Sequence, residues 1–211
     1  WEIGRESGAC SDHMEMSGFQ SSSIICAGKS ASGKLLVHRH ITVPGLRILP
    51  NDTSGSFCFN FSNSVCVIKV NEKTQSEYPQ KMIMRGDLTV LSDSCGAEIT
   101  REFINCADAP ALIEKVSIRV KSDCILEIDV PFKKKTLGAE YCVGKEIDYA
   151  VCGCSGDSVS FERAYDFKTK QNMRAKESYT FYMVYFAGRE NTVIDVKAQV
   201  RQRSALIESM F

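Results

Sequence analysis

The sequence has no excess of either charge, because Lys+Arg and Asp+Glu number 26 each among 211 residues. This balance excludes a chain-wide field that would attract nucleic acid or an anionic membrane, so neither is an expected partner. No apolar run reaches the roughly 18 residues that a membrane-spanning helix needs, and no signal peptide is visible at Trp1. We therefore expect a mature or trimmed ectodomain whose signal or membrane anchor would lie outside this sequence.

Metal-ligand patterns and catalytic groups are also scarce. The sequence contains no Cys-x2-Cys pair, and its three histidines all lie near the N-terminus. His38 and His40 would share one strand face, but no nearby Cys, Asp or Glu completes a set of metal ligands. The run 154–158 superficially resembles the Gly-Asp-Ser run of chymotrypsin-like proteases, yet Val159 stands where the oxyanion turn needs glycine. We expect no metal, no cofactor and no catalytic residue, and hence a protein that is not an enzyme.

Cysteine is abundant by contrast. The residues are even in number and spread along the chain: Cys10, Cys26, Cys58, Cys66, Cys95, Cys106, Cys124, Cys142, Cys152 and Cys154. Such usage is rare in reducing compartments and typical of the disulfide framework of an extracellular protein. The motif Cys152-Gly153-Cys154 resembles the Cys-x-Cys of cystine-knot growth factors, but a long segment follows it here, so we expect two disulfides to different partners. The connectivity stays open, since ten cysteines allow on the order of nine hundred complete pairings.

Two glycosylation sequons agree with an extracellular compartment. They are Asn51-Asp52-Thr53 and Asn60-Phe61-Ser62. Because the two lie close together in a cysteine-rich chain, we expect glycans at Asn51 and Asn60.

Alternation of apolar and polar side chains predicts about a dozen short strands. Residues 57–61 alternate and residues 65–70 are rich in β-branched side chains, so residues 57–70 are predicted to form a hairpin. Residues 35–43 alternate except at Arg39, which indicates an edge strand. Further strands are expected at 82–84, 88–91, 116–120, 124–130 and 159–167. Residues 112–115 and 169–177 are interpreted as single helical turns, and residues 133–135 as a basic turn.

The last third of the chain carries two of the clearest patterns. Residues 179–186 are apolar on both faces, as in a central strand that is covered on both sides. Residues 194–200 alternate, with Ile194, Val196, Ala198 and Val200 on one face. The turn residues 188–191 predict that these two strands pair as a hairpin.

The predicted fold class is all-β, built from disulfide-stapled antiparallel β-sandwich units, two in tandem. Residues 107–111 (Ala-Asp-Ala-Pro-Ala) form the candidate boundary between an N-terminal cysteine-rich β-domain, 1–107, and a C-terminal β-sandwich-like domain, 112–211. Six cysteines precede this boundary and four follow it, so each unit could pair its cysteines internally. Residues 62–70 and 121–130 look alike, which hints at a duplication.

Residues 85–91 resemble the integrin-binding motif Arg-Gly-Asp-Leu-x-x-Leu, through Arg85, Gly86, Asp87, Leu88 and Leu91. In such a motif the aspartate completes a metal site on the receptor, while the arginine reaches an acidic groove. The motif must lie on an exposed loop, and here it would form the tip of a hairpin or ordinary strand sequence.

The sequence favours a non-enzymatic extracellular recognition module, the ectodomain of a cell-surface or virion envelope glycoprotein that binds a protein partner. Cysteine-rich β ectodomains of this size occur in apicomplexan surface antigens, viral envelope glycoproteins and animal receptors, but no run assigns one of them. The alternatives are a secreted immune-modulating ligand and a secreted hydrolase, and a concave site with convergent titratable groups would favour the hydrolase.

Overall fold

The structure is a computed structural model of the chain. It describes residues 13–17, 23–29, 35–44, 56–61, 66–76, 80–85, 87–94, 96–106, 109, 111–137, 147–188 and 191–209. In strands β1 to β4 the side chains described are those of Val37 and Arg39.

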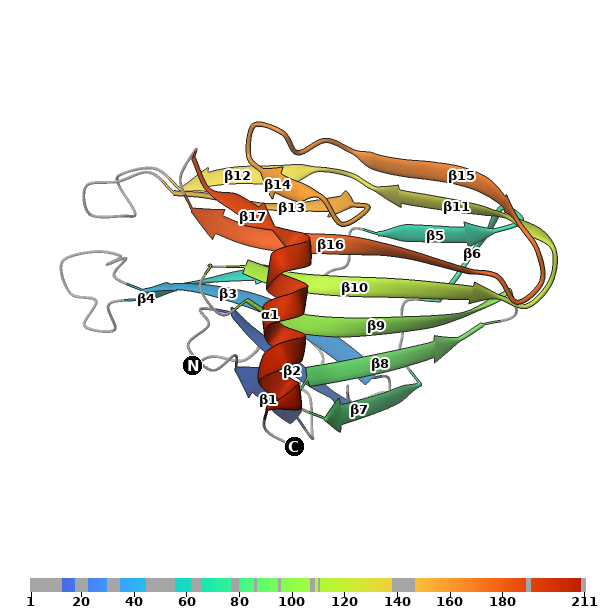
Figure 1. Ribbon diagram of the computed structural model, residues 1–211, viewed down its shortest axis with the longest axis horizontal. Coiled ribbons are helices and arrows are strands. Elements are labelled where there is room, and N and C mark those ends of the chain that lie inside the picture. The colour runs from blue at the N-terminus through green and yellow to red at the C-terminus, as the bar shows by residue number, and fades with distance from the viewer. Residues whose placement is uncertain are drawn as a thin grey trace.

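A seven-stranded antiparallel sheet forms the centre of the molecule (Figure 1). Its strands, in spatial order, are β12 (Lys133–Leu137), β13 (Ile147–Cys154), β16 (Ser178–Gly188), β10 (Ala111–Val120), β9 (Ala97–Asn105), β8 (Asp87–Asp93) and β7 (Lys81–Arg85).

Three smaller antiparallel sheets and one helix complete the described fold. The first sheet joins β1 (His13–Ser17), β2 (Ser23–Lys29), β3 (Leu35–Pro44) and β4 (Ser56–Phe61). The second sheet joins β15 (Phe167–Met173), β11 (Cys124–Val130), β5 (Val67–Val70) and β6 (Lys73–Thr74). The third pairs β14 (Ser158–Ser160) with β17 (Val193–Asp195), and helix α1 (Val196–Glu208) follows directly. The prediction of an all-β, sandwich-like architecture is therefore confirmed.

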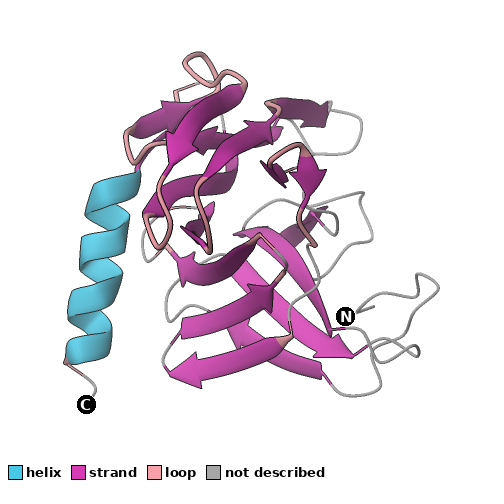
Figure 2. Ribbon diagram, turned by 90° about the vertical axis from the view of Figure 1, so that its right-hand side faces the viewer, coloured by secondary structure: helices cyan, strands magenta, loops and turns pink. Residues whose placement is uncertain are grey.

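The seven-stranded sheet buries side chains on both faces. On one face Leu112, Phe103 and Tyr185 pack with the inward side chains of β5 and β11, and β3 contacts β10 and β16 there. On the other face Ile113 and Phe186 pack with Val159, Phe161 and Ile194. Helix α1 runs across this second face in front of the sheet (Figure 1), on the outside of the fold (Figure 2). The alternation of strand side chains thus supplies two separate cores.

The candidate boundary at 107–111 lies between two paired strands. Strand β9 pairs with β10 from Leu112↔Asn105 to Val120↔Ala97. Strand β5 pairs with β11 across the same boundary, so the look-alike segments 62–70 and 121–130 contribute neighbouring strands. The described strands from the two sides of the boundary therefore share common sheets and do not separate into one set for each unit.

Several local predictions are wrong about pairing. Residues 56–61 and 67–70 are strands, but they do not form a hairpin, since β4 pairs with β3 and β5 pairs with β11 and β6. Strand β3 is confirmed, yet it lies between β2 and β4 and is not an edge strand. Arg39 on β3 is instead buried beside Glu114.

Other predictions are wrong about secondary structure. Residues 112–115 belong to β10, residues 133–135 to β12, and residues 169–173 to β15. Residues 159–167 are a strand only at their two ends, with turn and irregular structure from 161 to 166. The strands predicted at 82–84, 88–91, 116–120 and 124–130 are confirmed.

The last predicted hairpin is half confirmed. Strand β16 is central, between β13 and β10, and Phe181, Met183, Val184, Tyr185 and Phe186 are all fully buried. Residues 194–200 do not pair with it, because β17 ends at Asp195 and α1 begins at Val196. The carboxylate of Asp195 accepts a hydrogen bond from the backbone N–H of Ala198 at 3.0 Å, which caps the helix.

Candidate functional site

A group of charged side chains lies in the first core, between β3 and the seven-stranded sheet. Glu114 on β10 is completely buried, and Arg39 on β3 is 5% exposed. The Nε and Nη2 atoms of Arg39 donate to Oε2 and Oε1 of Glu114 at 2.7 and 2.9 Å. Arg101 Nη1 donates to Oε1 at 2.5 Å, and the Tyr185 hydroxyl donates to Oε2 at 2.9 Å. We call these four residues the Glu114 cluster.

The cluster keeps its carboxylate ionised. Burial alone would raise the pKa of Glu114, but the adjacent Arg39 and Arg101 guanidinium groups outweigh burial and lower it to about 2. Burial also raises the pKa of the Tyr185 hydroxyl. The Arg39 guanidinium lies 5.2 Å from the centroid of the Phe103 ring and 5.6 Å from that of Tyr185, within cation–π range. Because Glu114 is closed off from solvent, the cluster joins two layers and presents no group to a substrate.

A second group of charges lies on the solvent side of the sheet formed by β15, β11, β5 and β6. It consists of the outward side chains of β5, β11 and β15, which we call the β11 face: Val67, Lys69, Ile125, Glu127, Asp129, Lys168 and Lys170. Their inward neighbours, such as Ile68 and Leu126, belong to the core. A groove of about 560 Å³ crosses this face.

The β11 face combines ion pairs with exposed aliphatic side chains. Lys170 Nζ lies 2.6 Å from Glu127 Oε1, and Lys168 Nζ lies 3.6 Å from Asp129 Oδ2. The hydrogen bond from Lys170 lowers the pKa of the Glu127 carboxyl. Val67 and Ile125 are 39% and 40% exposed on the same face. The arrangement offers charges of both signs and apolar contacts to a molecule that lies against it.

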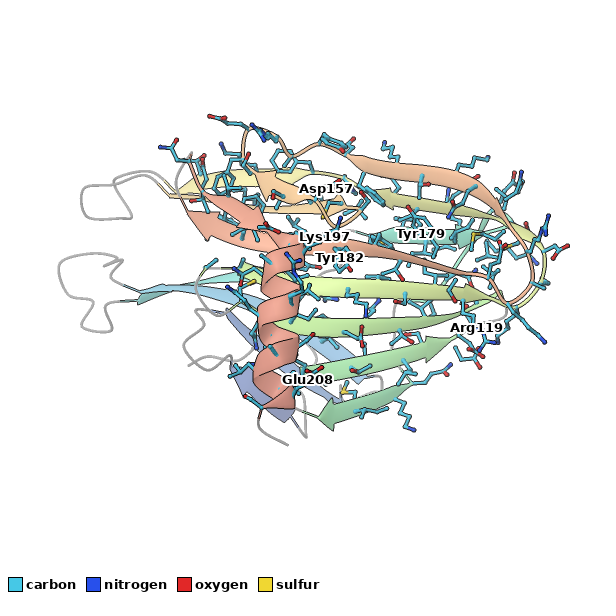
Figure 3. All side chains as sticks on the ribbon, in the orientation of Figure 1. Arg119, Asp157, Tyr179, Tyr182, Lys197 and Glu208 are labelled. Carbon is cyan, nitrogen blue, oxygen red and sulfur yellow. The ribbon has the colours of Figure 1, made fainter. Side chains whose placement is uncertain are left out.

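On the second face of the seven-stranded sheet, the stretch of β9, β10 and β16 beyond α1 carries polar side chains. Glu102 pairs with Lys115 at 2.5 Å, and the hydroxyls of Ser117 and Thr180 lie 3.1 Å apart. Figure 3 shows this face between α1 and Arg119, which lies at the far end of β10. At the helix end, Tyr182, Asp157 and Lys197 lie close together.

The integrin-like motif lies where β7 meets β8. Arg85 is the last residue of β7 and pairs with Asp87, while Gly86 and the Arg85 side chain lie outside the described residues. The Asp87 carboxylate accepts a hydrogen bond from Arg203 Nε of α1 at 2.9 Å. Leu88 is buried in the core. A receptor metal would have to replace Arg203 at Asp87, so integrin binding stays a prediction that requires this ion pair to open.

Five of the ten cysteines have described side chains, and all five are buried: Cys66, Cys106, Cys124, Cys152 and Cys154. No disulfide joins any two of these five residues. Burial raises the pKa of the Cys152 thiol to about 12, which makes it a poor nucleophile. The side chains of Cys10, Cys26, Cys58, Cys95 and Cys142 lie outside the described residues.

The remaining sequence candidates are placed only in part. Asn51 lies outside the described residues, and Asn60 lies on β4 opposite His40 with its side chain not described. His38 and His40 both lie on β3. Within the described residues no group of three His, Cys, Asp or Glu side chains could hold a metal ion. The run 154–158 forms the turn from β13 to β14, where Ser155 donates to Asp157 at 3.1 Å.

Sequence reasoning missed the residues with the densest polar contacts. The sequence pattern does not single out Glu114, Arg101 or Arg203, although a glutamate in phase with Leu112, Val116 and Ile118 on one strand face is a signal of a buried partner. Comparison with models of protein families and with curated proteins finds no match for this chain. Among the described helices, none is long and apolar enough to cross a membrane.

Proposed function

We propose that the chain is a non-enzymatic extracellular recognition module, the disulfide-bonded and glycosylated ectodomain of a cell-surface or virion envelope glycoprotein. It binds a protein partner through the β11 face. The cysteine count and the two sequons support the compartment. The layered antiparallel fold supports the class, because such sheets leave solvated outer faces free for contact.

The observation that carries the proposal is the composition of the β11 face. Two aliphatic side chains, Val67 and Ile125, are exposed beside paired charges on a regular strand surface. Protein interfaces combine apolar contacts with polar and charged ones, and Val67 and Ile125 supply the apolar contacts at the two ends of this face, on either side of Lys69 and Glu127. Exposed ion pairs contribute little to the stability of the fold, so Lys170 and Glu127 can exchange partners at small cost.

The test is binding of the purified chain, secreted from eukaryotic cells and fluorescently labelled, to a panel of cell surfaces. The double substitution Val67→Glu and Ile125→Glu should reduce saturable binding at least tenfold, because it replaces both apolar contacts of the face with unpaired charge. Val193→Glu is the matched control, since Val193 is 62% exposed on β17, away from the β11 face. Equal binding by the double variant and the control would contradict the choice of face, and absence of binding by the unaltered chain would contradict the recognition function.

A further inference from the structure

Strand β7 forms one edge of the seven-stranded sheet and has β8 as its single neighbour among the described strands (Figure 1). In an antiparallel sheet, about half of the backbone N–H and C=O groups of an edge strand point away from the neighbouring strand. Within the described part of the chain, no backbone group outside the β7–β8 hairpin bonds to residues 81–85. The outer edge of β7 therefore offers a row of hydrogen-bond donors and acceptors to an extended chain.

The other described edge strands carry features that oppose pairing with a further strand. Strand β12, the opposite edge of the same sheet, contains three successive lysines, residues 133–135. Strand β15 carries Lys168 and Lys170, and β6 has only two residues. In the sheet of β1 to β4, β1 has Glu15 at its centre and β4 includes the sequon at Asn60. Charged residues, lysine above all, and short length are the usual protection of exposed sheet edges.

The centre of β7 has no such protection. It consists of three successive apolar residues, Met82-Ile83-Met84. Met82 packs against the first core, and Ile83 is half-buried. The positive charges of the strand are confined to its two ends, Lys81 and Arg85. This edge is therefore apolar at its centre and basic at both ends, which differs from the lysine-rich edge formed by β12.

The charges at the two ends of β7 determine which strand fits beside it. Lys81 is exposed and forms no ion pair with a described side chain. Asp87, which lies opposite Arg85 in the hairpin, already accepts a hydrogen bond from Arg203 of α1. Two copies of β7 aligned antiparallel about Ile83 would place Lys81 of each copy opposite Arg85 of the other, and like charges directly opposite destabilise a strand pair. The end charges therefore disfavour a second copy of this chain and favour an acidic strand.

We propose that the outer edge of β7 binds an extended acidic segment of a partner protein, which adds a further strand to the seven-stranded sheet. Backbone hydrogen bonds hold such a strand, and its side chains supply the specificity. Carboxylates four residues apart on the segment meet Lys81 and Arg85, whose positions on β7 are about 14 Å apart. This contact goes beyond the proposed function, because β7 and the β11 face belong to different sheets.

The experiment is hydrogen exchange of the full chain with and without the peptide Ser-Glu-Val-Thr-Val-Glu-Ser, blocked at both ends. Its sequence is the same in both directions, so its two Glu residues can meet Lys81 and Arg85 in either strand orientation. We expect the outward amides of residues 81–85 to exchange about tenfold more slowly when the peptide is bound. The same peptide with Lys in place of both Glu residues is the matched control and should leave this exchange unchanged.

Three variants test the role of the strand itself. Ile83→Lys places at the centre of β7 the kind of residue that β12 carries, and it should abolish the protection by the acidic peptide. Ile83→Thr keeps a β-branched, uncharged residue there and should retain the protection, which separates an effect of charge from loss of packing. Lys81→Glu should weaken binding of the acidic peptide about tenfold, because one of its carboxylates then faces a like charge.

The outcomes separate this proposal from the proposed function. Equal protection by the acidic and basic peptides, or protection by neither, overturns the proposal. Slow exchange of every amide of residues 81–85 before any peptide is added shows that the edge is already paired, and it overturns the proposal as well. The double variant Val67→Glu and Ile125→Glu should bind the acidic peptide as the unaltered chain does, so loss of the β11 face as a binding surface would leave the β7 edge in place, and the reverse.

Discussion

Arg39 and Glu114 lie on strands of two different sheets, 75 residues apart in sequence, and meet through two hydrogen bonds of 2.7 and 2.9 Å. Glu114→Gln removes the negative charge and leaves the Arg39 and Arg101 guanidinium groups buried without a counter-charge. We expect this substitution to lower the free energy of unfolding by about 3–5 kcal/mol. Urea melts measure the loss. Glu102→Gln is the control, because Glu102 pairs with Lys115 at the surface and its loss should stay under about 1 kcal/mol.

The same carboxylate predicts a dependence of stability on pH. The folded-state pKa of Glu114, about 2, lies below its ordinary value of 4.5. A carboxyl group with a lowered folded pKa stabilises the fold fully above its unfolded pKa, and this contribution is lost as the pH falls through the folded pKa. The free energy of unfolding should therefore fall between pH 4.5 and about 2. Glu114→Gln should flatten that slope, and an identical slope in both proteins would contradict the role of Glu114.

Phe181 tests the position of β16 as a central strand. Its ring is completely buried and stacks on Phe167, with 5.6 Å between the ring centroids. Phe181→Ala should lower the free energy of unfolding by about 3–5 kcal/mol through loss of burial and the cavity left behind. Val193→Ala, at an exposed position, should change it by less than about 0.5 kcal/mol. Similar losses in denaturant melts of the two variants would be inconsistent with the described core.

Asp195 tests the start of α1. Because its carboxylate accepts from the Ala198 N–H, Asp195→Ala should destabilise the protein by about 1 kcal/mol. Asp195→Asn keeps an acceptor at this position and should recover most of the loss. Thermal unfolding of both variants checks the order. If residues 194–200 formed a strand with Asp195 in solvent, the alanine variant would be as stable as the parent.

Arg203 tests the attachment of α1 to the β7–β8 end of the sheet. Its guanidinium pairs with Asp87 Oδ1 at 2.9 Å, and burial raises the pKa of that carboxyl despite the pairing. Arg203→Ala should lower stability by about 1–3 kcal/mol, since it removes a charge-assisted hydrogen bond. The amides of residues 197–208 should exchange with solvent faster. Arg201→Ala, at an exposed position of the same helix, should leave both measurements nearly unchanged.

The sequence predicts the strands whose positions depend on a local pattern of apolar and polar side chains. Residues 179–186 are apolar on both faces, which is the pattern of a strand covered on both sides, and β16 is such a strand. Residues 194–200 show how a pattern can mislead. Val196 and Val200 fit both a strand of period two and a helix of period 3.6, and the choice is made by the Asp195 cap and by burial at Val196, Gln199 and Arg203.

Pairing between distant segments leaves no such local mark. In the sequence, Arg39 is a charged residue on an otherwise apolar strand face. Its partner Glu114 lies 75 residues further along the chain, so no local pattern identifies the pair. The turn residues 62–64 favour a hairpin, but β5 pairs with β11, which begins more than fifty residues further along the chain. Such partners are selected by the packing of whole layers and not by the chemistry of one turn.

The Glu114 cluster also determines when the N-terminal sheet can dock during synthesis of the chain. At about 5–20 residues per second, Glu114 leaves the ribosome on the order of 4 to 15 s after Arg39, and Tyr185 later still. During that interval the first four strands exist without the carboxylate against which their arginine is buried. The N-terminal sheet can therefore dock in its final position only when most of the chain has been made. Folding of this protein is completed late. Until then, the first four strands are the part of the chain most exposed to aggregation.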